Sequence, residues 1–423
     1  MTAAQTAAAA AWRELGARPA EVGELLAYAA SPFDTTALAQ VANGPPVDEP
    51  FVAAWSGYVD EAAGGSAAAV LRRHIIQLQF PIAPGVSQTA GYQAATRRGE
   101  LPRHECGADF ERPESVRVRL HATASGRVPV IVAATRADFE TLVRAFVHRN
   151  EPAPILPAMG ACIVSGYVNW SRVADARNAW NAANPGDTDG AGWAGAFQAL
   201  AADKPRYQDR LIILSTGPYS GTPAHVVGMH PDEWLARSLE LRTEHECAHY
   251  YTRRVLGSMR NSLIDELIAD FVGIVSATGR YDADWFCHFM GVERPGILRD
   301  SGRLWRYRGE PALSDGAFGV LQHAVRACAR CLADVEAGVR EKGGLRDTPL
   351  RARARWIHAI ALCGVETLAG RRGVGALEAA LARTGGHDDA RGHAHEAADR
   401  RSRVAHGGVY RVPTERPKRV WPA

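Results

Sequence analysis

The period of the hydrophobic pattern changes near residue 231, and this change constrains the fold more than any other feature of the sequence. Before it, the apolar residues alternate with polar ones or form short runs of strand length, at 116–120, 128–134, 161–168 and 210–215. After it, apolar residues recur at helical spacing over 231–256, 263–277, 316–341, 351–369 and 374–383. A part with strands and helices followed by a helical part predicts an α+β fold.

We expect four regions along the 423 residues. Residues 1–110 have a mostly helical pattern, although proline and glycine punctuate 81–113, which we expect to form a long loop. Residues 111–230 combine strands with helices, and residues 231–384 form the helical half. Residues 385–423 are polar and low in complexity, which predicts a flexible tail.

The composition excludes several classes of protein. With 46% hydrophobic residues the chain is too apolar to be disordered, and a net charge of +3 predicts no strong attraction to polyanions. Because no nucleic-acid motif is present either, we expect no nucleic-acid partner. Seven cysteines, an odd number, argue against a disulfide framework, and no apolar run has the length of a membrane span. We therefore expect a cytoplasmic protein without a membrane partner.

The segment with the clearest chemistry is His245-Glu246-Cys247-Ala248-His249, the pattern H-E-x-x-H. Pro231 suits a first helical position and Gly257 a left-handed helix end, so a helix is expected between them. On a helix, His245 and His249 lie one turn apart on the same face, where both imidazoles can reach one metal ion. Glu246 stands beside them and can take a proton from a zinc-bound water.

The next predicted helix offers a third ligand. Glu266 and Asp270 lie at one margin of its apolar stripe, so a carboxylate there can point into a site between the helices. Asp270 is placed to accept a hydrogen bond from a ligating histidine and fix its tautomer. Gly273 would allow the two helices to approach closely, and the segment 257–261 is short enough to make them an antiparallel pair.

Together, the two helices resemble the H-E-x-x-H…E-x-x-x-D signature of the gluzincin metallopeptidases, the thermolysin-like class, over roughly residues 231–279. The resemblance implies a zinc ion bound by His245, His249 and Glu266, with Glu246 as the general base and Asp270 supporting a histidine. Glu266 lies 17 positions after His249, slightly fewer than in the best-known members, and charged residues precede the motif where uncharged ones are more usual.

The sequence thus predicts a zinc-dependent hydrolase, a metallopeptidase that acts on a peptide or protein substrate. In zincins an edge strand usually precedes the active-site helix and pairs with extended peptide, and we assign this role to the strand at 210–215. The candidates for the donor that stabilises the oxyanion are Tyr250, Tyr251, Tyr281, His288 and His323.

Three other interpretations fit the same residues. The two histidines could be a hydrogen-bonded pair in an ordinary helical core. The protein could be a catalytically inactive binding protein that kept the zincin fold. It could also be a metal-dependent hydrolase of a non-peptide bond.

Overall fold

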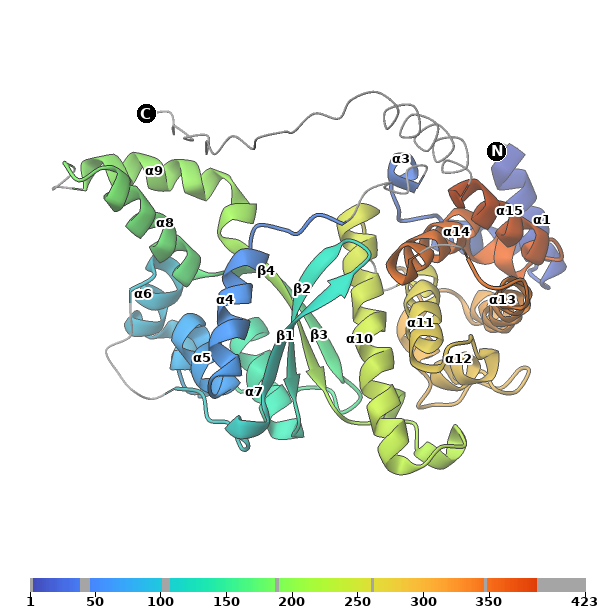
Figure 1. Cartoon of the computed structure of the whole chain (residues 1–423). Helices are drawn as coiled ribbons and strands as arrows, with labels where there is room; N and C mark the ends of the chain where they lie inside the picture. The colour runs from blue at the N-terminus through green and yellow to red at the C-terminus, as the bar shows by residue number, and fades with distance from the viewer. Residues whose placement is uncertain are drawn as a thin grey trace, which may run out of the picture.

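The computed structural model describes residues 3–38, 46–100, 107–186, 190–259, 262–345 and 348–385. The tail expected at 385–423 lies outside the described residues except for Gly385, where the last helix ends. Within the described residues the fold is α+β, as predicted: one mixed four-stranded sheet is surrounded by helices (Figure 1).

All four predicted strands are present, in the order β1-β2-β4-β3 across the sheet. They are β1 (Arg117–Thr123), β2 (Gly126–Ala133), β3 (Ala161–Val168) and β4 (Gln208–Ser215). β1 and β2 form an antiparallel hairpin, β2 pairs with β4 in parallel, and β3 pairs with β4 in the antiparallel sense.

The prediction that residues 210–215 form the edge strand is wrong, because β4 lies between β2 and β3. Its apolar run Leu211–Leu214 is fully buried, as expected of a strand covered on both faces. β3 is the edge strand on this side of the sheet, and several of its residues are half-exposed.

The two faces of the sheet pack against different helices. Alternate residues such as Ile131 and Ile213 point into a core shared with the helices before and after β1 and β2, whereas Val130 and Ile212 pack against the H-E-x-x-H helix. Figure 1 shows α4 and α5 on one side of the sheet and α10 on the other. The helices concerned are α4 (Val52–Ala63), α5 (Ala67–His74), α7 (Arg136–Val147) and α10 (Pro231–Val255).

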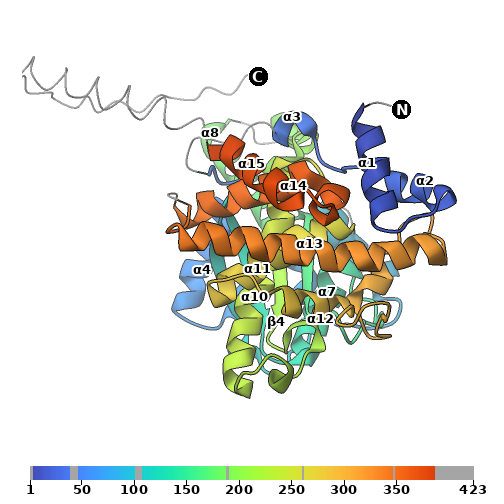
Figure 2. The same cartoon turned by 90° about the vertical axis from the view of Figure 1, so that its right-hand side faces the viewer.

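Beyond α10, the predicted helical half is present and packs into one large core. It comprises α11 (Leu263–Thr278), α12 (Ala283–Met290), α13 (Asp315–Glu341), α14 (Pro349–Ala369) and α15 (Gly373–Gly385). The first helices of the chain, α1 (Ala3–Glu14), α2 (Pro19–Tyr28) and α3 (Thr35–Leu38), join this core rather than the sheet (Figure 2). The expected region 1–110 is therefore divided between two cores, with residues 3–38 in one and 51–78 in the other.

The remaining helices flank the sheet region. α6 (Ala90–Arg98) lies within the expected loop 81–113, with the Thr89 side chain capping its start. α8 (Trp170–Ala183) and α9 (Ala191–Ala202) extend away from the sheet (Figure 1). Short 3-10 turns complete the chain: η1 (Ile76–Gln79), η2 (Val86–Gln88), η3 (Pro113–Ser115), η4 (Lys204–Arg206), η5 (Tyr219–Gly221), η6 (Ala224–Val226) and η7 (Arg303–Tyr307). In the described part of the chain, no helix combines the length and apolar character needed to cross a bilayer.

Candidate metal centre

α10 begins and ends at the predicted residues. Pro231 is its first residue, and Asp232 and Glu233 lie in the first turn, where the helix dipole favours acidic side chains. At the other end Gly257 has a φ of +72°, a left-handed conformation that suits glycine. From Leu241 to Thr252 the helix lies between the sheet and the helical half, and every residue there except Glu246 is buried.

α10 and α11 pack as an antiparallel pair. Leu241, early in α10, meets Gly273, late in α11, whereas His249, late in α10, meets Glu266, early in α11. A Cβ atom at position 273 would stand 2.8 Å from the Leu241 carbonyl oxygen, closer than real Cβ contacts. Glycine is therefore required for the close approach that brings the predicted ligands together.

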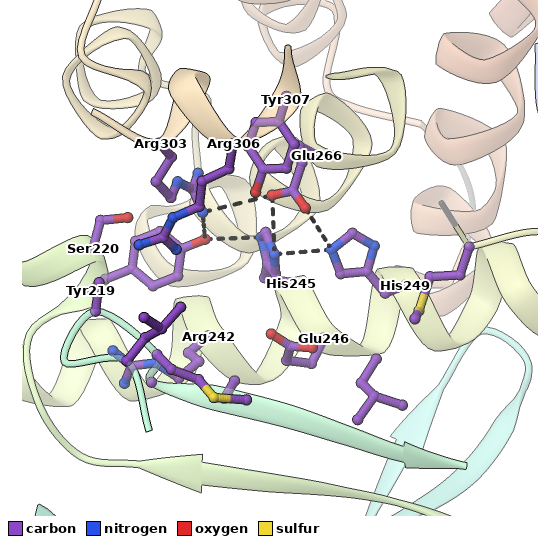
Figure 3. Close-up of a pocket in the computed structure, with 17 residues that line it drawn as sticks. Tyr219, Ser220, Arg242, His245, Glu246, His249, Glu266, Arg303, Arg306 and Tyr307 are labelled. Carbon is purple, nitrogen blue, oxygen red and sulfur yellow. Dashed lines mark hydrogen bonds and ion pairs between the residues drawn. The ribbon is translucent and has the colours of Figure 1, made fainter. Parts of the chain in front are cut away.

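The three predicted ligands converge on one point, and we call His245, His249 and Glu266 the metal tripod (Figure 3). The two histidine Nε2 atoms are 3.1 Å apart. Glu266 Oε2 lies 3.7 Å from His245 Nε2, and Glu266 Oε1 lies 3.5 Å from His249 Nε2. All three side chains are buried.

The spacing of these donor atoms fits a tetrahedral zinc ion. Atoms bound to one zinc at about 2.0–2.1 Å in tetrahedral geometry stand about 3.4 Å apart. The separations in the metal tripod, from 3.1 to 3.7 Å, bracket that value. Two imidazoles and a carboxylate are also a donor set that zinc commonly takes in catalytic sites. The residues present therefore fit a divalent cation.

Each histidine of the metal tripod faces a carboxylate through its other ring nitrogen. His245 Nδ1 lies 2.9 Å from Asp270 Oδ1, which is the contact that the sequence predicts. His249 Nδ1 lies 3.3 Å from Asp265 Oδ1, and the Thr252 hydroxyl donates to the same oxygen at 3.0 Å. A carboxylate at Nδ1 keeps the proton there and leaves the Nε2 lone pair for a metal.

The buried charges in the site stabilise one another. Burial opposes ionisation of Glu266, but the hydrogen bond and charge of His249, together with His245 and Arg303, hold the pKa of Glu266 far below its ordinary value. Burial likewise opposes protonation of His249, yet Asp265 and Glu266 raise its pKa well above 6.5. Glu266 is thus an anion, as a carboxylate ligand must be, whereas a metal ion would displace the extra proton that His249 holds in its absence.

Two residues that the sequence did not indicate complete the support of His245. The Tyr219 hydroxyl on η5 donates to Asp270 Oδ1 at 2.6 Å, and Arg303 on η7 donates to the Tyr219 oxygen at 3.0 Å. Arg303 also forms an ion pair with Asp270. Burial opposes ionisation of Asp270, but Arg303 and His245 keep its pKa below the ordinary value.

Glu246 stands beside the metal tripod and differs from it in exposure. Its side chain is half-buried and lines a cavity of about 410 Å³ that also exposes His245, His249 and Glu266 (Figure 3). No hydrogen bond or ion pair joins its carboxylate to another described residue. An accessible carboxylate next to a metal site is placed to exchange protons with water.

The five candidates for the oxyanion donor lie outside this cavity. The hydroxyls of Tyr250 and Tyr251 bond to Glu49 and His358. Of the remaining three, Tyr281 belongs to the helical core, His288 pairs with Glu293, and His323 is exposed on α13. None of these five residues lines the cavity. The polar side chains that do line it, besides Glu246 and the metal tripod, come from η5, α10 and η7: Tyr219, Ser220, Arg242, Arg303, Arg306 and Tyr307.

A second group of potential ligands, His121, Glu244 and Cys247, lies on the sheet side of α10. His121 Nε2 is 3.1 Å from one Glu244 oxygen, and Arg353 Nη1 is 2.9 Å from the other. Burial raises the pKa of Cys247, so its sulfur is a neutral thiol there. A carboxylate that already pairs with an arginine does not favour a second cation, and we interpret this group as an ion-pair cluster.

Comparison with known proteins gives a family but no activity. A family of unknown function (DUF7005) matches residues 11–372. No curated protein and no solved structure matches the sequence significantly. The match includes both α10 and α11, so the metal tripod lies inside the part of the chain that the family model matches.

Proposed function

Because the chain belongs to the DUF7005 family of unknown function, we propose its activity from the site: a zinc-dependent hydrolase, most specifically a metallopeptidase. The observation that supports this best is the convergence of His245 Nε2, His249 Nε2 and the two Glu266 carboxylate oxygens at 3.1–3.7 Å, with Glu246 beside them and unpaired among the described residues. A core histidine pair would not need an accessible carboxylate next to it, whereas hydrolysis requires one.

In the proposed mechanism, His245, His249 and Glu266 hold a zinc ion, which when bound lowers the pKa of water and polarises a carbonyl group. Glu246 accepts the proton from the attacking water and later passes it to the leaving amine. Asp270 and Asp265 hold the two imidazoles in the tautomer that presents Nε2.

Tyr307 is our candidate for the donor that stabilises the developing oxyanion. It lines the cavity, and its phenol lies beside the Glu266 carboxylate (Figure 3). Burial and the nearby carboxylate raise its pKa, so the phenol remains protonated and able to donate.

The edge strand supports a peptide as the substrate. β3, rather than the strand at 210–215, borders the cavity through Ala161 and Ile163, and Gly160 precedes it. An extended peptide lying along the open edge of β3 would add a strand to the sheet and pass in front of Glu246.

Metal content and hydrolysis of the purified protein test this proposal. We expect about one zinc per chain, loss of zinc in His245→Ala, and retention of zinc in the control variant His323→Ala, whose histidine is exposed. Against a casein or peptide library, Glu246→Gln should retain zinc and lose hydrolysis by at least about 100-fold, as expected for removal of a general base.

The same experiments separate the alternatives. A protein without zinc would favour the structural histidine pair. A zinc-loaded wild type that is as inactive as Glu246→Gln on every substrate would favour a binding protein. Hydrolysis of small esters or amides, but of no peptide, would favour a non-peptide substrate.

A further inference from the structure

The charges around the cavity are unequally distributed. Apart from Glu246 and the metal tripod, the charged residues among the described lining are three arginines: Arg242, Arg303 and Arg306. In Figure 3 all three lie on the Tyr219 side of His245, whereas His249 lies on the other side. One end of the cavity is therefore cationic.

Two of these arginines form no ion pair with an acidic residue in the described part of the chain. Arg303 is neutralised by its ion pair with Asp270. Arg242 has no carboxylate within 4.0 Å among the described residues, and its guanidinium donates only to main-chain oxygens, those of Ser215 at 2.8 Å and Pro218 at 3.2 Å. Arg306 forms no ion pair within the described part of the chain either, but it is exposed to water.

Arg242 is the unusual residue, because only 4% of it is exposed. A buried cation that no described carboxylate contacts within 4.0 Å is costly. Burial lowers the pKa of this guanidinium, and the charges of Tyr219 and Glu246 oppose that shift only in part. The fold nevertheless makes room for it. A Cβ atom at Gly160 would stand 2.7 Å from Arg242 Nε. Glycine immediately before β3 therefore leaves space for the guanidinium beside the cavity.

The position of Arg242 relates it to the reaction. It precedes Glu246 by one helical turn on α10, so the two side chains are neighbours on the same wall. Its guanidinium lies over the ring of Tyr219, with 5.7 Å from Cζ to the ring centroid, and Arg303 approaches the same ring at 5.3 Å. An anionic group bound here would lie next to the bond that the proposed site hydrolyses.

We propose that the cavity selects substrates with a carboxylate group, which binds Arg242 at the Tyr219 end of the site and is assisted by Arg306. The proposal rests on the proposed function, since it takes the cavity as the substrate site. A buried guanidinium that no described carboxylate contacts matches the single charge and planar geometry of a carboxylate. The carboxylate can be an acidic side chain or the C-terminus of a peptide.

Peptide binding to the Glu246→Gln variant tests the proposal without turnover. Fluorescence anisotropy would compare labelled peptides in which one position at a time is Glu or Gln, each with a free or an amidated C-terminus. We expect one Glu position, or the free C-terminus, to bind about 10- to 100-fold more tightly than its neutral counterpart, as a charge-assisted buried contact would. A preference for Glu at one position identifies an acidic side chain as the source of the carboxylate, and a preference for the free C-terminus identifies the end of the peptide.

Variants then assign the preference to Arg242. In the Glu246→Gln background, Arg242→Gln should abolish it and Arg306→Gln should reduce it a few-fold. Arg237→Gln, an exposed arginine on the same helix that pairs with Glu240 at 3.4 Å, should leave it unchanged. If Arg242→Gln does not fold because its contacts with Ser215 and Pro218 are lost, the peptide comparison in Glu246→Gln and the exposed Arg306→Gln variant still test the proposal.

The outcomes separate this inference from the proposed function. Equal binding and equal hydrolysis of acidic and neutral peptides would overturn the carboxylate preference and leave the hydrolase intact. Arginine-dependent binding of acidic peptides by a protein that holds no zinc and hydrolyses nothing would support the preference and contradict the hydrolase.

Discussion

Asp270 connects the metal tripod to the rest of the protein through three contacts. It accepts from His245 and from the Tyr219 hydroxyl, and it pairs with Arg303. A carboxylate in this position orients the ligating imidazole and increases its basicity. The Asp270 side chain is fully buried, so water cannot readily replace it as the hydrogen-bond partner of His245.

We predict that Asp270→Asn weakens zinc binding by about 10- to 100-fold, because the amide cannot supply the negative charge that holds His245. Competition with a chromophoric zinc chelator would measure the affinity. The control is Asp232→Asn, an exposed acid in the first turn of α10. An unchanged affinity in Asp270→Asn would mean that His245 does not depend on this contact.

The residues of the site divide into those that a local pattern predicts and those that only the fold brings together. His245, Glu246 and His249 share one helix, and Glu266 and Asp270 follow at helical spacing, so periodicity places them. Tyr219 and Arg303 lie on short turns at 219–221 and 303–307, where no repeat specifies which way a side chain points. Their role depends on tertiary packing, which the spacing of residues along a single sequence does not reveal.

At the scale of elements, the contact between α10 and α11 determines whether the ligands meet. Gly273 lies against the Leu241 carbonyl, with no space for a Cβ atom. The prediction that residues 210–215 form the edge strand was wrong at this scale. The position of β4 in the sheet depends on its pairing with β2 and β3, and a buried apolar run does not reveal which strands lie beside it. The boundaries of α10 were predictable because proline and glycine mark its ends.

We predict that Gly273→Ala destabilises the protein by about 1–3 kcal/mol, since the added methyl group must force the helices apart. It should also weaken zinc binding, because His249 and Glu266 are on opposite helices. Gly319→Ala on α13, where a Cβ atom would meet nothing within 4 Å, is the matched control and should be neutral or stabilising. Urea denaturation with and without zinc measures both effects; equal stability of the two variants would contradict the close-contact argument.

His358, a histidine outside the site, links α14 to α3 and α10, and we expect it to make the stability of the protein depend on pH. His358 on α14 lies 3.1 Å from the Leu38 carbonyl oxygen through Nδ1 and 2.9 Å from the Tyr251 hydroxyl through Nε2. The neutral ring satisfies both contacts, by donating to the carbonyl and accepting from the phenol. Burial lowers the pKa of His358 below 6.5, although the hydrogen bond to Leu38 opposes the shift.

Because the unfolded chain binds a proton at this histidine more readily than the folded one, its contribution to stability is complete above about pH 6.5 and is lost as the pH falls toward the folded-state pKa. We therefore expect the wild type to lose more unfolding free energy than His358→Gln between pH 7.5 and pH 5. Urea midpoints across this range provide the measurement. Parallel curves for the two proteins would show that His358 contributes no such dependence.

At the scale of the whole molecule, the two ends of the described chain meet in one core. α1 and α2 pack against α13 and α14, far from the sheet that follows them in sequence (Figure 2). The sequence predicts the helices of residues 3–38 but not the elements they pack against, because an amphipathic stripe identifies a buried face and not its partner. The α+β class was predictable, whereas the division of residues 1–110 between two cores was not.

Trp12 tests this arrangement, because it is fully buried in the core shared with the helical half. We predict that Trp12→Ala destabilises the protein by about 3–5 kcal/mol, through the cavity it leaves. Trp305→Ala, whose side chain is 43% exposed, should cost much less. Thermal denaturation compares the two variants; similar melting temperatures would indicate that α1 does not stabilise the helical half.

The central claim is that two adjacent helices hold one divalent cation between them. A crystal structure of the zinc-loaded protein, with anomalous data on both sides of the zinc absorption edge, tests it most directly. We predict one zinc peak at about 2.0–2.2 Å from His245 Nε2, His249 Nε2 and a Glu266 oxygen. A zinc peak bound by other residues, with these three side chains directed away from it, would contradict the account.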